Sequence, residues 1–413
     1  MIDKTNNNFE IYYAISMIAF ALITVLGKFY SLPINNAIIN IIFACLPSII
    51  CIIIYNPQFK KQYFFLLIIM VVMKILSISI NLYNNNINNS DLLSEIYYFI
   101  CFLLNYIGIF FFILPKSKKE NVSFHFFSIV FLCVSIIFCA YNIASNNISI
   151  EKILNSNNSY DFLFSSFFTN RNHFGKMLFA ANIFLLYMNV YKKISKMNFI
   201  LLFSFININL LLTFSRTAIF CTLILYMLFL FRNKKYWMYA LICIIVIFGA
   251  YELFPTFKAF MDTFIIRKSS GLTGRGDIWK SAYSIFIKSP IFGFTNTYSS
   301  KLVYNLSSNY YFHNSFIKIV CSDGIFCLLS WIGVFMLIFY TNSNKLVFQN
   351  KEVKNKYNYL KAAFISTIIY SFFEEYILMG PGIINYWYSF ILFIFIPILY
   401  YNIIVENKVK YNE

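Results

Sequence analysis

Charge is the property that this sequence has least of. Only 12% of the 413 residues are charged, whereas 60% are hydrophobic and 21% aromatic, and the mean hydropathy is +0.68. Soluble globular domains carry about 25% charged residues. The composition therefore excludes a soluble domain and predicts a membrane protein, which we expect to be all-α because helices satisfy their own backbone hydrogen bonds in lipid.

Metal and redox motifs are also missing. The nine cysteines lie in or beside apolar runs, and no two have the close Cys-x-x-Cys spacing that a zinc or redox site usually needs. The sequence also lacks a paired-aspartate or His/Cys cluster of the kind that binds a divalent cation. We therefore expect inert thiols, no metal and no other cofactor.

The formal net charge of +17 could suggest a nucleic-acid partner. However, the basic residues form small clusters between apolar runs instead of one face, and no nucleic-acid-binding motif is present. We interpret the charge as topological information and expect membrane lipids, not nucleic acid, around the protein.

About twelve stretches have the 17 to 25 mostly apolar residues that a membrane span needs. The N-terminal segment lacks the basic region and cleavage site of a signal peptide, so its first apolar run should remain as a span. We expect one integral membrane domain, residues 1–413, with spans near 11–27, 37–55, 62–80, 96–114, 123–143, 173–191, 197–214, 217–231, 236–254, 314–340, 361–377 and 387–405.

Lys and Arg are distributed unevenly between alternate loops. One set of loops, together with both chain ends, holds 19 of them, and the other set holds 12, of which seven lie in residues 255–312. Short basic loops stay in the cytoplasm, so we expect both termini there and the long 255–312 loop, between spans nine and ten, outside. In this loop Trp279, Tyr283, Phe286 and Ile287 share one helical face, which predicts a short amphipathic helix on the membrane surface or over a cavity.

Three polar groups fall on this outer side. Arg216 opens the eighth span, where a helix N-terminus favours an anion. Arg275 lies between two glycines that allow close backbone approach, just ahead of Asp277 as the expected N-cap. Two guanidiniums suit a pyrophosphate, and His313 could take a proton from a hydroxyl. Each residue alone is equally compatible with an interfacial position, but together they favour a catalytic site.

The order of these motifs carries a resemblance. SRT at the start of a span, TGRxxxW, PxxG at Pro290–Gly293, and HNSF leading into a span with DG together resemble the O-antigen ligase and O-antigen polymerase superfamily. The resemblance extends from NRNHFGK at 170–176 to Gly324, and the first five spans match only in being apolar. It implies a metal-independent glycosyltransferase of the bacterial cytoplasmic membrane, whose donor is a polyprenyl-pyrophosphate-linked glycan.

The resemblance also implies residue roles. Arg216 and Arg275 would hold the pyrophosphate, and His313 would sit at the acceptor hydroxyl. Glu374 and Glu375 could neutralise an arginine, accept sugar hydroxyls or simply lie at the interface, and NRNH at 170–173 could line the glycan site or form a capped helix start. We assign substrate binding to Asn170, Arg171, Asn172, Trp279, Asn314 and Glu375.

The acceptor remains open, because a polymerase uses another lipid-linked repeat unit and a ligase uses lipid A core. A transporter of the same lipid-linked glycan is the rival from another class. Transporters place charges near the bilayer midplane and often repeat their halves, whereas this sequence shows neither feature. Finally, Lys318 and Asp323 inside the tenth span suggest that Asp323-Gly324 breaks that helix beside a cavity.

Overall fold

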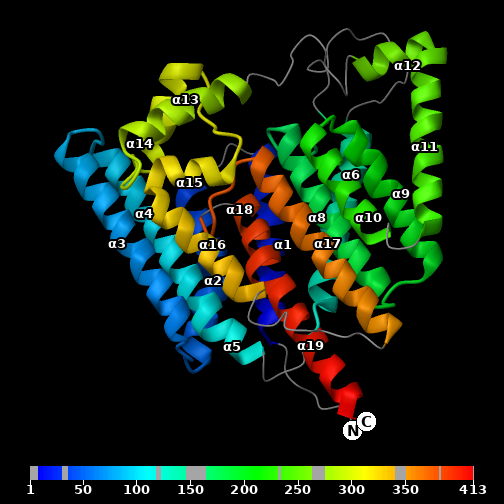
Figure 1. Ribbon diagram of the computed structural model, residues 1–413, viewed down its shortest axis with the longest axis horizontal. Coiled ribbons are helices and arrows are strands. Elements are labelled where there is room, and N and C mark those ends of the chain that lie inside the picture. The colour runs from blue at the N-terminus through cyan, green and yellow to red at the C-terminus, as the bar shows by residue number, and fades with distance from the viewer. Residues whose placement is uncertain are drawn as a thin grey trace.

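The protein is a bundle of helices (Figure 1). The computed structural model describes residues 8–29, 36–117, 122–145, 164–230, 234–262, 275–339, 350–380 and 383–412, and no β-strand occurs among them, which confirms the all-α fold. The elements are α1 (Asn8–Phe29), α2 (Asn36–Ile54), α3 (Lys61–Tyr83), α4 (Asn89–Ile107), the π-helix η1 (Gly108–Ile113), α5 (Leu114–Ser117), α6 (His125–Ser145), α8 (Arg171–Val190), α9 (Lys196–Leu212), α10 (Arg216–Leu230), α11 (Lys234–Leu253), α12 (Pro255–Phe260), α13 (Arg275–Lys288), α14 (Asn296–Ser307), α15 (Ser315–Asp323), α16 (Ile325–Phe339), α17 (Lys351–Phe373), α18 (Ile383–Phe390), the π-helix η5 (Ile391–Phe395) and α19 (Ile396–Asn412).

Asparagine defines several helix starts. Asn170, Asn314 and Asn350 precede α8, α15 and α17, and each side chain accepts a hydrogen bond from a backbone N–H of the first turn. Asn88 and Asp91 form a reciprocal capping box at the start of α4. These side chains satisfy backbone donors that would otherwise lack partners, so the asparagines between the apolar runs specify where the helices begin.

Five described segments are long and apolar enough to cross a membrane: Glu10–Phe29, Lys61–Tyr83, Asn89–Ser117, His125–Ser145 and Asn385–Asn407. Four shorter apolar helices accompany them. Helix α8 is less apolar, but nearly every residue from Phe174 to Met188 is buried by its neighbours. A helix enclosed by other helices need not present an apolar surface to lipid.

The predicted tenth span, 314–340, consists of two helices. Gly324 adopts φ +81° and separates α15 from α16, so the long apolar run begins only at Ile325. The break predicted at Asp323-Gly324 is therefore present. Helix α15 crosses the end of the bundle, whereas α16 runs down its side (Figure 1).

A second glycine fits into this break. A Cβ on Gly293 would meet the backbone of Ser322 and Asp323, and one on Gly324 would meet the backbone of Ile291. Backbone hydrogen bonds from Phe294 to Cys321 and from Thr295 to Ser322, both 2.8 Å, join the same two segments. The PxxG and DG motifs are thus two halves of one backbone crossing that tolerates no side chain.

The start of α1 and the end of α19 lie at the same end of the bundle. Glu10 accepts a hydrogen bond from the backbone N–H of Phe127 at the start of α6, 2.9 Å away. Asn402 of α19 donates to the carbonyl of Val122, just before the same helix, over 2.7 Å. Helices α13 and α14 lie at the opposite end (Figure 1).

The described basic clusters gather at the end that holds α1's start. Lys192 pairs with Glu352 at 3.1 Å, and Lys356 pairs with Glu406 at 3.0 Å, which joins α8, α17 and α19 there. Lys60, Ser117 and Tyr401 line one small cavity at this end. Lys4, Lys118, Lys119, Arg232 and Lys345, which were counted on this side, lie outside the described part of the chain, as do Arg267 and Lys268 of the 255–312 loop.

The predicted apolar face of α13 is correct in part, because Trp279 and Phe286 pack against a buried cluster. Ile278, Ala282 and Ile285 are the buried side chains, and they pack against α14 and α15. Tyr283 and Ile287, expected on that face, are 65% and 57% exposed. The face of α13 that α14 and α15 bury is therefore narrower than the apolar face that the sequence pattern indicates. Asp277 lies within the first turn of α13 and is not its N-cap.

The first helices anchor the segment that follows α13. Glu95 of α4 accepts hydrogen bonds of 2.6 Å from both the backbone N–H and the hydroxyl of Thr297 at the start of α14. Lys74 of α3 pairs with Asp323 at the end of α15, 2.7 Å away. The α3 and α4 helices therefore hold α14 and α15 in place.

Candidate functional site

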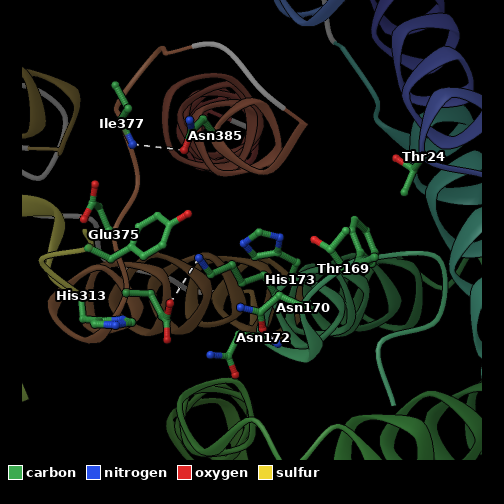
Figure 2. Close-up of a pocket in the computed structure, with 13 residues that line it drawn as sticks. Thr24, Thr169, Asn170, Asn172, His173, His313, Glu375, Ile377 and Asn385 are labelled. Carbon is green, nitrogen blue, oxygen red and sulfur yellow. Dashed lines mark hydrogen bonds and ion pairs between the residues drawn. The ribbon is translucent and has the colours of Figure 1, made fainter. Parts of the chain in front are cut away.

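A polar cavity of about 450 Å³ opens at the end of the bundle opposite the basic clusters. Helices α1, α8 and α18 form part of its wall, and the segments around His313 and Glu375 form the rest (Figure 2). Asn170, Asn172, His313 and Glu375, four of the residues predicted from the sequence, line it. The structure thus brings together side chains that are up to 205 positions apart, from 170 to 375.

His313 is held in an unusual backbone conformation. Its φ of +50° lies in the left-handed region, which costs a residue with a Cβ about 1–2 kcal/mol. The residue before it is fixed at both ends: the Phe312 N–H donates to Glu375 over 2.6 Å, and its carbonyl accepts from the Trp279 indole over 3.1 Å. Strained residues persist where the surroundings over-determine them, often at functional sites.

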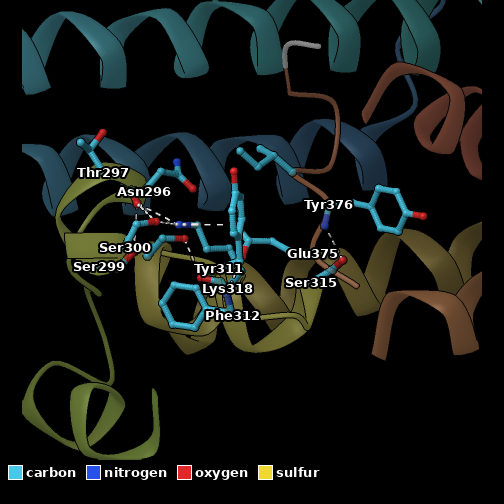
Figure 3. A network of polar contacts seen from close by, with 12 residues as sticks. Asn296, Thr297, Ser299, Ser300, Tyr311, Phe312, Ser315, Lys318, Glu375 and Tyr376 are labelled. Carbon is cyan, nitrogen blue, oxygen red and sulfur yellow. Dashed lines mark hydrogen bonds and ion pairs between the residues drawn. The ribbon is translucent and has the colours of Figure 1, made fainter. Parts of the chain in front are cut away.

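Lys318 completes the support of this turn (Figure 3). Its ammonium donates to the carbonyl of Asn296 over 2.8 Å and lies 3.8 Å from a carboxylate oxygen of Glu375. It also sits 4.9 Å from the centre of the Phe312 ring. The lysine is only 3% exposed, so its charge is directed at groups within the protein. Its contacts with Glu375 and with the Phe312 ring hold these two residues next to each other.

Burial sets the protonation of His313. It lowers the pKa of the imidazole below its ordinary value, while the nearby Glu374 carboxylate opposes the shift and the Arg275 guanidinium adds to it. The imidazole is therefore neutral at pH 7. A neutral imidazole can accept a proton, as a general base must.

Glu374 is the electrostatic centre of the site. Its carboxylate lies 3.3 Å from the Lys176 ammonium and 3.1 Å from the Arg275 guanidinium, and the residue is only 4% exposed. The two cations compensate the charge of this carboxylate, which would otherwise be costly to bury. The expectation that one of the two glutamates neutralises an arginine is confirmed for Glu374.

Arg275 reaches the start of the helix that Arg216 begins. Arg216 is the first residue of α10, and the next residue, Thr217, accepts a hydrogen bond from Arg275 over 3.4 Å. Arg275 therefore reaches from α13 to the N-terminus of α10, where backbone N–H groups add positive potential. Neither arginine lines the cavity, but Arg275 contacts Glu374, which does.

Other predicted residues have structural partners. Asn314 is 6% exposed, caps α15, and donates to the carbonyl of Phe372 over 3.1 Å. Trp279 binds the backbone at Phe312, as described above. Arg171 is buried and does not line the cavity, whereas Asn170 both lines it and caps α8.

The structure adds cavity residues that the sequence analysis did not assign. Lys176 follows Asn172 by one helical turn and lines the cavity from the same face of α8, so the spacing could have identified it. Thr24 and Asn385 come from α1 and α18, and nothing local in the sequence distinguishes them. Among the residues that the structure describes, no three His, Cys, Asp or Glu side chains are grouped to hold a metal ion.

Residues 199–332 match the family model for O-antigen ligase. This match supports the O-antigen ligase and O-antigen polymerase superfamily that the motif order predicted. The matched range contains Arg216, Arg275 and His313, and it ends before Glu374 and does not include Lys176. No curated protein matches the chain significantly. The match also supports a membrane function of the O-antigen ligase or polymerase type, with lipid-linked glycan and acceptor partners in general.

Proposed function

We propose that the protein is a membrane glycosyltransferase that polymerises oligosaccharide repeat units carried on a polyprenyl pyrophosphate. The observation that carries the proposal is the meeting of His313, Arg275 and the N-terminus of α10 around the buried Glu374 carboxylate, beside a polar cavity large enough for sugar residues. The match to the O-antigen ligase family agrees with this chemistry.

The proposed reaction is a single displacement. His313 accepts the proton of an acceptor hydroxyl as its oxygen bonds to the anomeric carbon of the donor sugar. The bond from that carbon to the pyrophosphate oxygen breaks, and its electron pair leaves with the polyprenyl pyrophosphate. Attack from the opposite face inverts the configuration of the anomeric carbon.

Arg216 and Arg275 stabilise the leaving group in this proposal. The guanidiniums form paired hydrogen bonds with non-bridging oxygens, and their fixed charge supplies what a divalent cation could otherwise supply. Asn170, Asn172 and Glu375 face the cavity in which the acceptor sugar would lie. We further propose that this end of the bundle faces outward from the bacterial cytoplasmic membrane and that both termini are cytoplasmic.

A polymerase and a ligase differ in the acceptor that they use. A polymerase extends another lipid-linked repeat unit, whereas an O-antigen ligase transfers the glycan to lipid A core. The ligase alternative has its own support, because the matched family model is described as O-antigen ligase.

Turnover assays with the purified protein test the polymerase and the ligase alternatives. Incubation with a synthetic polyprenyl-pyrophosphate repeat unit should yield a ladder of longer lipid-linked glycans, with EDTA causing no loss of turnover. Transfer only after lipid A core is added would establish the ligase instead. Absence of product with either acceptor, or turnover that EDTA abolishes and a divalent ion restores, would refute the proposed mechanism.

A further inference from the structure

An apolar groove of about 740 Å³ is lined mainly by side chains of α16 and α17. Phe335 of α16 and Phe364 of α17 line it and touch edge to face, with ring centroids 6.2 Å apart, and Tyr400 of α19 also lines it. Ile332 is 37% exposed and Met336 63% exposed, so the groove is open on the outside of the bundle. In a membrane such a surface meets hydrocarbon chains.

One end of the groove adjoins the candidate site. Phe316 and Phe372, which line this end, pack against each other with tilted rings whose centroids are 4.8 Å apart. Asn314, next to His313, donates to the carbonyl of Phe372, and Ser315 donates to the carbonyl of Glu374 over 3.0 Å. The turn that carries His313 therefore forms the boundary between the polar site and the apolar groove.

The groove also extends far enough to hold a long chain. It reaches along α17 from Phe372 to Tyr357. These fifteen helical steps correspond to about 22 Å, most of the roughly 30 Å hydrocarbon thickness of a bilayer. A cavity in the protein interior would enclose a compact ligand, whereas this open channel parallel to a helix suits an extended one.

We propose that this groove holds the polyprenyl chain of the glycan donor. The inference rests on the proposed function, which places the donor pyrophosphate beside Arg275 and Glu374. From that position the hydrocarbon chain must leave toward lipid, and the groove is an apolar path that begins at the adjoining turn. An ordinary bilayer phospholipid is the competing occupant, and the experiment separates the two.

Photolabelling tests occupancy without requiring turnover. A polyprenyl pyrophosphate that carries a diazirine in its chain, but no glycan, is incubated with the full-length protein in nanodiscs and mapped by mass spectrometry. We expect labelled residues around Ile332 and Ile365, and excess unlabelled polyprenyl pyrophosphate should suppress the labelling. Equal labelling by a diazirine phospholipid that polyprenyl pyrophosphate does not displace would assign the groove to bilayer lipid and overturn the proposal.

A pair of variants on α16 gives the kinetic test. Ile332→Trp narrows the groove, whereas Leu329→Trp places the same ring on an exposed position, 52% exposed, that does not line it. Ile332→Trp should raise the KM for a long-chain donor about tenfold, equivalent to losing contact with roughly two CH₂ groups, and leave a short-chain donor unaffected. Leu329→Trp should behave like the wild type with both donors.

The two proposals can fail separately. Specific labelling of the groove in a protein that makes no glycan product would retain the groove and refute the glycosyltransferase. Normal turnover with labelling elsewhere, and with the same KM in Ile332→Trp as in Leu329→Trp, would retain the enzyme and refute the groove.

Discussion

At the scale of single residues, His313 combines a strained backbone with a lowered pKa. Glu375 and Trp279 hold the peptide groups on either side of Phe312, and this grip maintains the left-handed conformation of the next residue. The result is a neutral imidazole aimed at a polar cavity. Glu375 and Trp279 thus support His313 through the backbone, a role that neither side chain reveals in the sequence.

Activity should depend on pH through His313. Burial lowers the pKa of His313 below the ordinary histidine pKa of 6.5, so the imidazole stays neutral at pH 6.5. As the pH falls, kcat/KM should therefore decrease only below pH 6.5. His313→Ala should lose about a hundredfold to ten-thousandfold in rate and still bind donor. His173→Asn changes the other histidine of the cavity and should leave the decrease of kcat/KM at low pH unchanged. If that decrease disappeared in His173→Asn, His173 and not His313 would be the general base.

Arg275 should be replaceable by lysine only poorly. Arg275→Ala removes a charge-assisted contact to the donor, at a cost of about 1.5–3 kcal/mol in transition-state binding, and lysine lacks the planar fork that meets two oxygens. Single-turnover rates with Lys288→Ala as the matched control on α13 measure this cost, since Lys288 is exposed at the other end of the helix. Full activity in a well-expressed Arg275→Ala protein would remove the arginine from the mechanism.

At the scale of elements, the crossing of Gly293 and Gly324 connects the loop before α14 to the break between α15 and α16. Both glycines have positive φ, and each approaches the backbone of the other segment. This crossing decides where α15 ends and therefore where His313, at its start, is placed relative to α16. The helix break is thus part of the architecture of the site.

A side chain at Gly324 should loosen this crossing. Gly324→Ala adds a methyl group that clashes with the backbone of Ile291. It also requires a residue with a Cβ to adopt a positive φ, so the free energy of unfolding should fall by at least about 1–2 kcal/mol. Gly27→Ala in α1, where nothing lies within 4 Å, is the control and should not destabilise the protein. Thermal unfolding in detergent compares the two, and equal melting temperatures would contradict the account.

At the scale of the whole molecule, charge divides the bundle into two ends. The described lysine clusters lie at the end that holds the start of α1 and the end of α19, and the polar cavity lies at the other. Basic residues in short loops remain in the cytoplasm, so the cavity should face outward. A lipid-linked glycan would then meet the site on the outer surface of the membrane.

Cysteine labelling tests this orientation in a background from which the nine native cysteines have been removed. Lys280→Cys on α13 and Lys354→Cys on α17 are exposed positions at opposite ends. An impermeant thiol reagent added to intact cells should label Lys280→Cys at once and Lys354→Cys only after the cells are opened. The reverse pattern would place the site in the cytoplasm and refute an outward-facing enzyme.

Local pattern in the sequence was sufficient to predict the all-α membrane fold, the approximate helix limits, the superfamily and the common end of Arg216, Arg275 and His313. These features follow from hydrophobic runs, capping asparagines, charge distribution and motif order, all of which are readable along the chain. The tertiary structure alone decided which buried charges pair. Lys176, Arg275 and Glu374 come from three separate helical regions, and Lys74 meets Asp323 across 249 positions. A sequence indicates that a charge in an apolar region needs a partner, but the partner is chosen by how the helices pack.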